Sequence, residues 1–177
     1  MAIVTSMMSG PAITLILRLG KKRTLQDALS SRLFTRELQA FSSRMAIHEL
    51  ASMACEASGL NTSEVEAAVW EREETLPTGI GNGVALPHAR IDGISKPILA
   101  VGISDTGIDF DAPDDKLAHI VFLILTPASD PEAQLEITAG LARLFREHGM
   151  TERVLKTKSY TEFLALVKSL PVEAEAA

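Results

Sequence analysis

Three apolar runs in the middle of the chain limit the fold more than any other feature of the sequence. They are "GVAL" at residues 83–86, "PILAVGI" at 97–103 and "HIVFLILT" at 119–126. Their apolar residues are continuous rather than alternating with polar ones, which is typical of strands that are covered on both faces. The chain therefore has to supply helices for both sides of a β-sheet.

Helical patterns lie before and after these strands. Apolar residues recur at helical spacing over residues 43–58, and Gly59 follows where a helix would end. A second helix is predicted from Ser63, whose side chain forms a capping box with Glu66. Three more helices are predicted after the strands, at residues 131–148, at 150–157 and from the capping residue Ser159 to Pro171. This order predicts an α/β protein, a three-layer α/β/α sandwich.

Length and composition limit the number of domains and the classes of function open to the chain. At 177 residues the chain holds one ordinary domain, predicted at residues 24–171 and followed by a disordered tail at 172–177. Its formal net charge of -6 argues against nucleic acid as a partner. The single cysteine, Cys55, excludes an internal disulfide and a cage of cysteine thiolates around a metal.

The start of the chain is unusually apolar. No charged side chain precedes Arg18, and more cations follow as far as Arg23, so residues 1–23 form an apolar segment with a basic flank. The segment is borderline in length for a membrane helix, and Gly10-Pro11 would kink it. A membrane helix and an amphipathic N-terminal helix are therefore both open interpretations.

A glycine-rich segment with one histidine, "TGIGNGVALPHAR" at residues 78–90, is the strongest candidate for chemistry. Gly79, Gly81 and Gly83 have neither the spacing of a dinucleotide-binding fingerprint nor the lysine of a nucleotide phosphate loop. Glycine lets backbone amides approach an anion closely, so the amides from Gly79 to Gly83, Asn82 included, form a candidate phosphate pocket. A plain turn before a strand explains the same glycines, and the residues alone leave both interpretations open.

A histidine and an arginine complete the candidate site. His88 follows Pro87, whose fixed φ makes the position of the ring well defined. A neutral histidine carries a nitrogen lone pair, so it can act as a base, a metal ligand or a nucleophile toward phosphorus. Arg72 lies seven residues after Val65 on the predicted buried face of the second helix, where an arginine needs an anionic partner. That partner is either a carboxylate such as Asp92 or a bound oxyanion beside His88.

A further histidine, His119, opens the strand at residues 119–126 and either reaches the site or only caps the strand. A metal-dependent hydrolase built on His88 and His119 would need a third protein ligand that the sequence does not obviously supply. We therefore predict neither a metal nor an organic cofactor.

The stretch "EREETLPTGIGNGVALPHAR" resembles the signature of the type 2 enzyme IIA domains of the bacterial phosphoenolpyruvate-dependent phosphotransferase system, the fructose, mannitol and nitrogen-regulatory class. This resemblance implies a mixed β-sheet between helices and a phosphohistidine carrier. His88 would accept a phosphoryl group at Nε2 from a histidine phosphocarrier protein and donate it to a IIB domain, with Arg72 stabilising the phosphate. Many members of the family have a second histidine where this chain has Gln134, so Gln134 and His119 are secondary candidates.

The N-terminal stretch "IVTSMMSGP" resembles the last membrane helix of sodium/proton antiporters, some of which carry cytoplasmic C-terminal domains. This resemblance implies an alternative function, a non-catalytic regulatory or sensor domain of a cation/proton antiporter. In both cases we expect a cytoplasmic domain, held at the inner face of the membrane where residues 1–20 associate with it.

Overall fold

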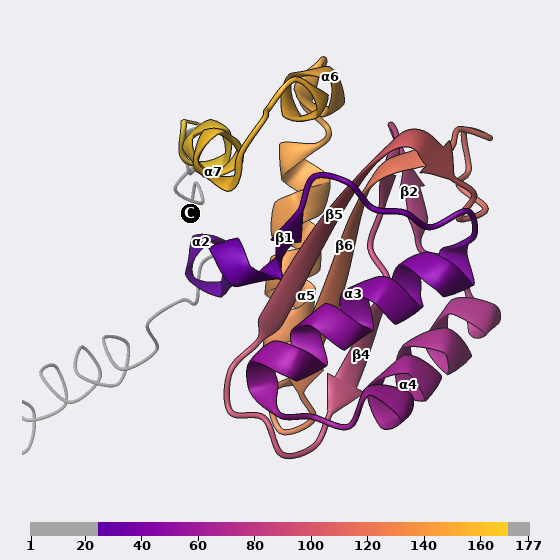
Figure 1. The fold of residues 1–177 in the computed structure, drawn as a ribbon, viewed down its shortest axis with the longest axis vertical. Helices are drawn as coiled ribbons and strands as arrows, with labels where there is room; N and C mark the ends of the chain where they lie inside the picture. The colour runs from indigo at the N-terminus through magenta and orange to yellow at the C-terminus, as the bar shows by residue number, and fades with distance from the viewer. Residues whose placement is uncertain (1–24, 170–177) are drawn as a thin grey trace, which may run out of the picture.

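The computed structural model describes residues 25–169, and a mixed six-stranded sheet forms its centre (Figure 1). In spatial order the strands are β1, β5, β6, β3 and β2, and β4 also pairs with β6. Their bounds are β1 Phe34–Thr35, β2 Gly79–Gly81, β3 Val84–Ala85, β4 His88–Ile91, β5 Ile98–Ile108 and β6 Ala118–Pro127. The three apolar runs of the sequence form β3, β5 and β6, as predicted.

The long strands β5 and β6 are antiparallel and lie at the centre of the sheet. On the side of β6 away from β5, the short strands β3 and β4 follow one another, both parallel to β6. Ala85 of β3 lies opposite Val121, and His88 of β4 lies opposite Ile124. β1 is parallel to β5 and β2 is antiparallel to β3. The sheet is therefore mixed, as the family resemblance implies.

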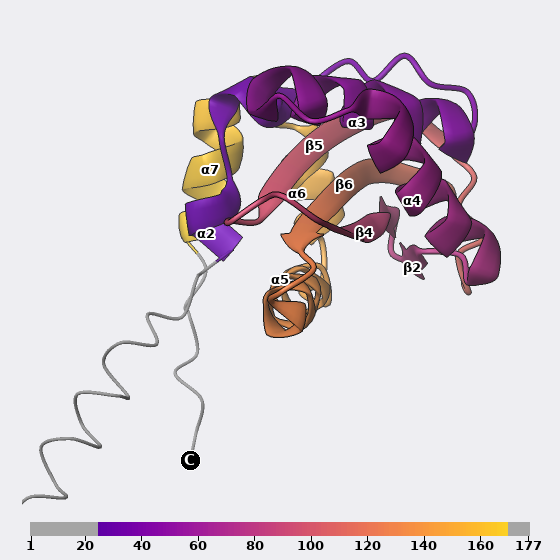
Figure 2. The same ribbon diagram turned by 90° about the horizontal axis from the view of Figure 1, so that it is seen from below.

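Helices cover both faces of the sheet, which confirms the three-layer α/β/α sandwich (Figure 2). α3 and α4 lie on one face and α5 on the other, and α6 and α7 share the apolar cluster of α5. Residues along β6 alternate between the two clusters, Val121 toward α3 and α4, Phe122 toward α5. The helices are α2 Leu25–Ala28, α3 Ser43–Ser58, α4 Thr62–Thr75, α5 Pro131–Leu144, α6 Met150–Leu155 and α7 Tyr160–Lys168, with a 3-10 turn at Ser31–Leu33.

Several helix boundaries differ from the predicted ones, and α6 and α7 end at Leu155 and Lys168, before the predicted ends at residue 157 and Pro171. α4 begins at Thr62 rather than Ser63, because the Asn61 side chain caps it by accepting hydrogen bonds from two amides of the first turn. α5 ends earlier than predicted, at Leu144, where Phe145 takes the C-cap position and its side chain is buried in the core. The one-residue shift at the start of α4 is a choice between neighbouring residues that local spacing leaves undecided.

The predicted cap of the last helix is confirmed, since the Ser159 hydroxyl accepts from the amide of Glu162 at 3.3 Å. The apolar segment at residues 1–23 and the tail at 172–177 lie outside the described residues. Within residues 25–169, no helix is long and apolar enough to cross a membrane.

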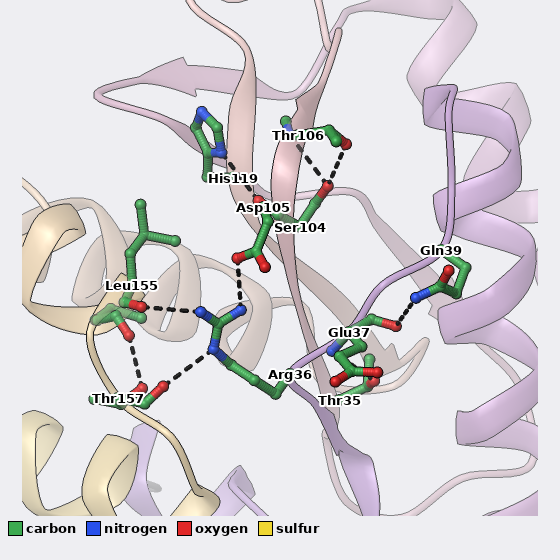
Figure 3. Close-up of polar contacts among 12 residues, drawn as sticks. Thr35, Arg36, Glu37, Gln39, Ser104, Asp105, Thr106, His119, Leu155 and Thr157 are labelled. Carbon is green, nitrogen blue, oxygen red and sulfur yellow. Dashed lines mark hydrogen bonds and ion pairs between the residues drawn. The ribbon is translucent and has the colours of Figure 1, made fainter.

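Arg36, which follows β1, ties the sheet to the C-terminal helices (Figure 3). Its Nη2 donates to the Leu155 carbonyl at 3.0 Å, its Nε donates to the Thr157 carbonyl at 3.1 Å, and its Nη1 pairs with Asp105 at 2.9 Å. The last carbonyls of a helix lack partners inside that helix, so a cation at the end of α6 is favourable. This contact lies at the end of the sheet where β6 begins, and His88 lies further along β6.

Candidate active site

The ring of His88 is held at the start of β4. The carbonyl of the preceding Pro87 accepts from the amide of Ile124 at 2.9 Å, and β4 pairs with β6 from His88 onward. His88 is only 9% exposed, and its Nδ1 lies 2.8 Å from the Leu86 carbonyl oxygen. A carbonyl oxygen can only accept, so this contact puts the proton of the neutral ring on Nδ1 and the lone pair on Nε2.

The surroundings of His88 lower its pKa. Burial is the largest cause, because desolvation disfavours the imidazolium ion. The Leu86 carbonyl acts in the opposite direction, and the positive charges of Arg72 and Arg90 lower the pKa further. The net effect favours the neutral ring, whose Nε2 lone pair is then available to an electrophile.

Arg72 approaches the site from α4, beside the buried stripe of that helix rather than on it. The buried residues of α4 are Val65, Val69 and Glu73. The predicted position of Arg72 on this stripe is therefore wrong by one residue, and its side chain is half-buried. Nη1 of Arg72 donates to the Leu76 carbonyl at 3.0 Å, which ties the guanidinium to the end of α4. Within residues 25–169 no ion pair joins Arg72 to Asp92, which is exposed.

The glycine loop before β3 uses two of its amides inside the protein. The amide of Gly79 donates to the Phe110 carbonyl at 3.2 Å, and the amide of Asn82 donates to the Asp114 carboxylate at 2.9 Å. Neither amide is available to an anion beside His88. Acceptors from the loop after β5 therefore occupy two of the amides from which the phosphate pocket was predicted.

The glycines of this loop also shape its turn. Gly81 and Gly83 have φ values of 83° and 75°, and Asn82 between them has 53°, all in the left-handed region that glycine and asparagine tolerate best. The tip of the loop lies beside the first residues of β6, since the Gly83 carbonyl accepts from the amide of His119 at 2.8 Å. His88 pairs with the middle of β6, so the loop tip and the histidine lie apart.

Two residues on the α5 side complete the surroundings of His88. Arg90 follows His88 by two residues on β4, so the two side chains share one face of the strand. Nε of Arg90 donates to Oε1 of Gln134 at 3.1 Å, which brings the first turn of α5 next to the strand that carries His88. Arg90 is absent from the predicted site, although its two-residue spacing from His88 could have indicated it.

Residues 27–170 match the family model of the phosphoenolpyruvate-dependent sugar phosphotransferase system, EIIA 2. The chain belongs to this family. The fructose-specific EIIA component of Haloferax volcanii is 39% identical over 115 residues, which cover 64% of this chain and 75% of that protein. The nitrogen regulatory protein of Bradyrhizobium diazoefficiens is 27% identical over 150 residues, which cover 85% of this chain and 98% of that protein. The chain is thus an EIIA phosphoryl carrier component of a phosphotransferase system.

Solved structures of IIA proteins have the same fold as this EIIA domain. The nitrogen regulatory protein IIA-Ntr from Neisseria meningitidis aligns with a TM-score of 0.76 and 26% identity, over 81% of this chain and 98% of that one. IIA mannitol from Escherichia coli aligns with a TM-score of 0.68 and 21% identity, over 78% and 98%. The complex of the same mannitol protein with phosphorylated IIB gives a TM-score of 0.69 at 20% identity, over 80% and 98%.

His119 of the EIIA domain lies away from His88, beside Ser104 (Figure 3 shows His119 and Ser104). Its Nδ1 lies 2.9 Å from the Ser104 carbonyl, and a Cβ on Gly107 would lie 3.0 Å from its ring. His88 is opposite Ile124, roughly 16 Å further along β6 at the usual rise of a strand. The structure therefore does not bring the two histidines together as the prediction of a second site residue requires. In the described part of the domain, no group of three or more His, Cys, Asp or Glu could hold a metal ion.

The EIIA domain buries one carboxyl group near the site, that of Glu73, which is also absent from the predicted site. Glu73 is 6% exposed and accepts from the Thr78 amide at 3.0 Å and from the Thr78 hydroxyl at 2.5 Å. Burial raises the pKa of Glu73, and the hydrogen bonds from Thr78 and the charge of Arg72 partly offset this. Its helical spacing, eight residues after Val65 and four after Val69, was the signal in the sequence.

Proposed function

We propose that His88 is the phosphorylated residue of this EIIA domain and carries the phosphoryl group on Nε2. The observation that carries this proposal is the contact between Nδ1 and the Leu86 carbonyl, since it leaves Nε2 as the ring nitrogen with the lone pair. The lowered pKa of His88 supports it, because a neutral ring is the nucleophilic form.

The transfer step needs no net proton movement. Nε2 of His88 attacks the phosphorus of a phosphohistidine on an incoming phosphocarrier protein, and a new P–N bond forms. The old P–N bond breaks, and its electron pair returns to the donor imidazole. The guanidinium groups of Arg72 and Arg90 bind the equatorial oxygens, which carry the negative charge of the transition state. Donation to a IIB domain follows the same step with His88 as the donor.

Two exposed leucines flank the site and suit the docking of a partner protein. Leu76, 59% exposed, carries the carbonyl that Arg72 binds, and Leu135, 72% exposed, follows Gln134 on α5. Exposed apolar side chains around a polar functional group are typical of protein interaction sites. We expect a histidine phosphocarrier protein and then a IIB domain to cover these leucines, in line with the mannitol IIA protein of the same fold, which forms a complex with phosphorylated IIB.

Incubation of the chain with phosphoenolpyruvate, enzyme I and a phosphocarrier protein tests the assignment of His88. Mass spectrometry at neutral pH should show the gain of one phosphoryl group on the wild-type chain and no gain on His88→Ala. His119→Ala is the matched control, because it removes a histidine from the same sheet but away from the site, and it should be phosphorylated like the wild type. Phosphorylation of His88→Ala would refute the proposal.

A second candidate function is a regulatory or sensor domain of a cation/proton antiporter, which rests on residues 1–23 and on Gln134. In this role the apolar segment with its basic flank holds the domain, residues 24–171, at the cytoplasmic face of a membrane. The absence of phosphorylation by the phosphocarrier, together with flotation of the full chain on anionic phospholipid vesicles, would favour this function. Equal flotation of a chain that begins at Thr24 would argue against a role for residues 1–23.

A further inference from the structure

A continuous series of hydrogen bonds connects the buried carboxyl group of Glu73 with the ring of His88. The carboxyl group accepts from both the amide and the hydroxyl of Thr78. The Thr78 carbonyl accepts from the Leu86 amide at 3.0 Å. The Leu86 carbonyl accepts from Nδ1 of His88 at 2.8 Å. The backbone of Leu86 therefore joins the carboxyl group on α4 to the histidine on β4.

The middle of this series has little freedom to move. Thr78 and Leu86 are both buried, so water does not offer their backbone groups other partners. The next amide, that of Gly79, donates to the Phe110 carbonyl at 3.2 Å. A Cβ on Gly79 would lie 2.6 Å from that carbonyl oxygen, so the backbone here is packed without spare room. The Thr78 carbonyl is thereby held in place for the Leu86 amide.

A buried carboxyl group is a costly choice for a purely structural position. Glu73 continues the stripe of Val65 and Val69, where an apolar side chain would add to the core without desolvating a charge. The amide and hydroxyl of Thr78 compensate part of that cost. They also bind the carboxyl group to Thr78, whose carbonyl accepts from the Leu86 amide beside His88. The buried position of Glu73 is thus explained by its hydrogen bonds to Thr78.

We propose that Glu73 is a positioning residue for phosphoryl transfer, which acts through Thr78 and Leu86 to keep the proton of His88 on Nδ1 and Nε2 free to attack phosphorus. This inference rests on the proposed function of His88. Glu73 contacts neither the phosphoryl group nor the reacting nitrogen, so its effect is on the tautomer and orientation of the ring. The outer partners of metal-bound histidines act in the same way.

Four variants separate this role from a contribution to folding. Thr78→Val removes the hydroxyl that reaches Glu73, and Thr78→Ser restores it. Glu73→Gln keeps the shape of the side chain but leaves only one oxygen to accept from Thr78. Thr75→Val is the matched control, because the Thr75 hydroxyl donates to the Glu71 carbonyl at 2.9 Å on the same helix and has no link to His88.

The measurements are the ¹⁵N shifts of the His88 ring, which report the tautomer, and the rate of phosphorylation by the phosphocarrier protein. Thr78→Val and Glu73→Gln should populate the Nε2–H tautomer and slow phosphorylation by roughly 10- to 100-fold, by analogy with the outer partners of metal-bound histidines. Thr78→Ser and Thr75→Val should stay within about twofold of the wild-type rate.

An unchanged tautomer in both Thr78→Val and Glu73→Gln overturns the proposal, whether the rate falls or not, since a slower rate alone is what a structural role produces. The amide spectrum of each variant shows whether it folds. If Thr78→Val does not fold, the tautomer of His88 in Glu73→Gln alone tests the proposal. These outcomes are distinguishable from a failure of the proposed function, which appears as phosphorylation of His88→Ala.

Discussion

Replacement of Arg72 is the sharpest test of how the site stabilises a phosphoryl group. Arg72 is one of two cations whose charge acts on His88, and its guanidinium is oriented by the bond to the Leu76 carbonyl at 3.0 Å. Arg72→Gln removes the charge, whereas Arg72→Lys keeps a charge but loses the planar fork that binds two oxygens at once. Both variants should slow the phosphorylation of His88, Arg72→Gln more than Arg72→Lys.

The size of the effect follows from the surroundings of Arg72. Loss of one preorganised donor in a water-excluded site costs about 3–4 kcal/mol of transition-state stabilisation. Arg72 is only half-buried, and Arg90 remains as a second cation, so the cost here should be smaller. We expect about 2–3 kcal/mol for Arg72→Gln, which is a reduction in rate of roughly 30- to 150-fold. Arg72→Lys should lose about tenfold.

The assay has to separate this effect from a change in the pKa of His88. Arg72 lowers that pKa, so its removal raises the pKa and leaves less neutral histidine at acidic pH. Single-turnover phosphorylation measured at about pH 8, well above the ordinary histidine pKa, keeps the ring neutral in every variant. A rate for Arg72→Gln within about threefold of the wild type at that pH would refute the role of Arg72 in the transition state.

Three further predictions concern the same region. Arg90→Gln should raise the pKa of His88, because one of the two cations that lower it is gone, and an NMR titration of the ring that finds no upward shift contradicts this. Gly79→Ala should lower the free energy of unfolding by about 1–3 kcal/mol, because the new Cβ meets rigid backbone. Gly140→Ala should raise the free energy of unfolding by about 0.5–1 kcal/mol, because the nearest atom to its Cβ is 3.9 Å away. Urea denaturation measures both. The raised pKa of Glu73 means that the folded state binds a proton on this carboxyl group more tightly than the unfolded chain does. The free energy of unfolding of the wild type should therefore fall relative to that of Glu73→Gln as pH rises from about 4 through the raised pKa. The opposite trend in denaturation curves would contradict the assigned direction.

The main features of the fold were predictable because the responsible signals are local. Continuous apolar runs predict strands buried on two faces, and β5 and β6 are such strands. β1, β2 and β4 were missed because they are too short to show a period. β4, His88–Ile91, becomes a strand only because it pairs with residues 124–127 of β6, far along the chain. Such pairing depends on the whole sheet, and no local pattern encodes it.

The site divides in the same way between local and distant causes. Pro87 and the position of His88 after a buried strand could be read from neighbouring residues. The hydrogen-bond partners of the Gly79 and Asn82 amides could not be predicted from neighbouring residues. The acceptors, Phe110 and Asp114, come from a loop about thirty residues later. Glu73 was not predicted as part of the site for a different reason. Spacing predicts which helix positions are buried, but not that a carboxyl group at such a position accepts two hydrogen bonds from Thr78.

The pairing of Arg90 with Gln134 explains how this site can operate where the family resemblance places a second histidine. A histidine there would be charged only below a pKa near about 6.5, whereas an arginine keeps its charge at any physiological pH. Gln134 accepts from Nε of Arg90, and within residues 25–169 no protein group accepts from its Nη1 or Nη2, which leaves both for phosphate oxygens. Under the proposed function, the positive charge beside His88 then comes from arginine and does not change with pH. If His88 carries the phosphoryl group as proposed, Gln134 makes the charge available to that group independent of pH, because arginine rather than histidine supplies it.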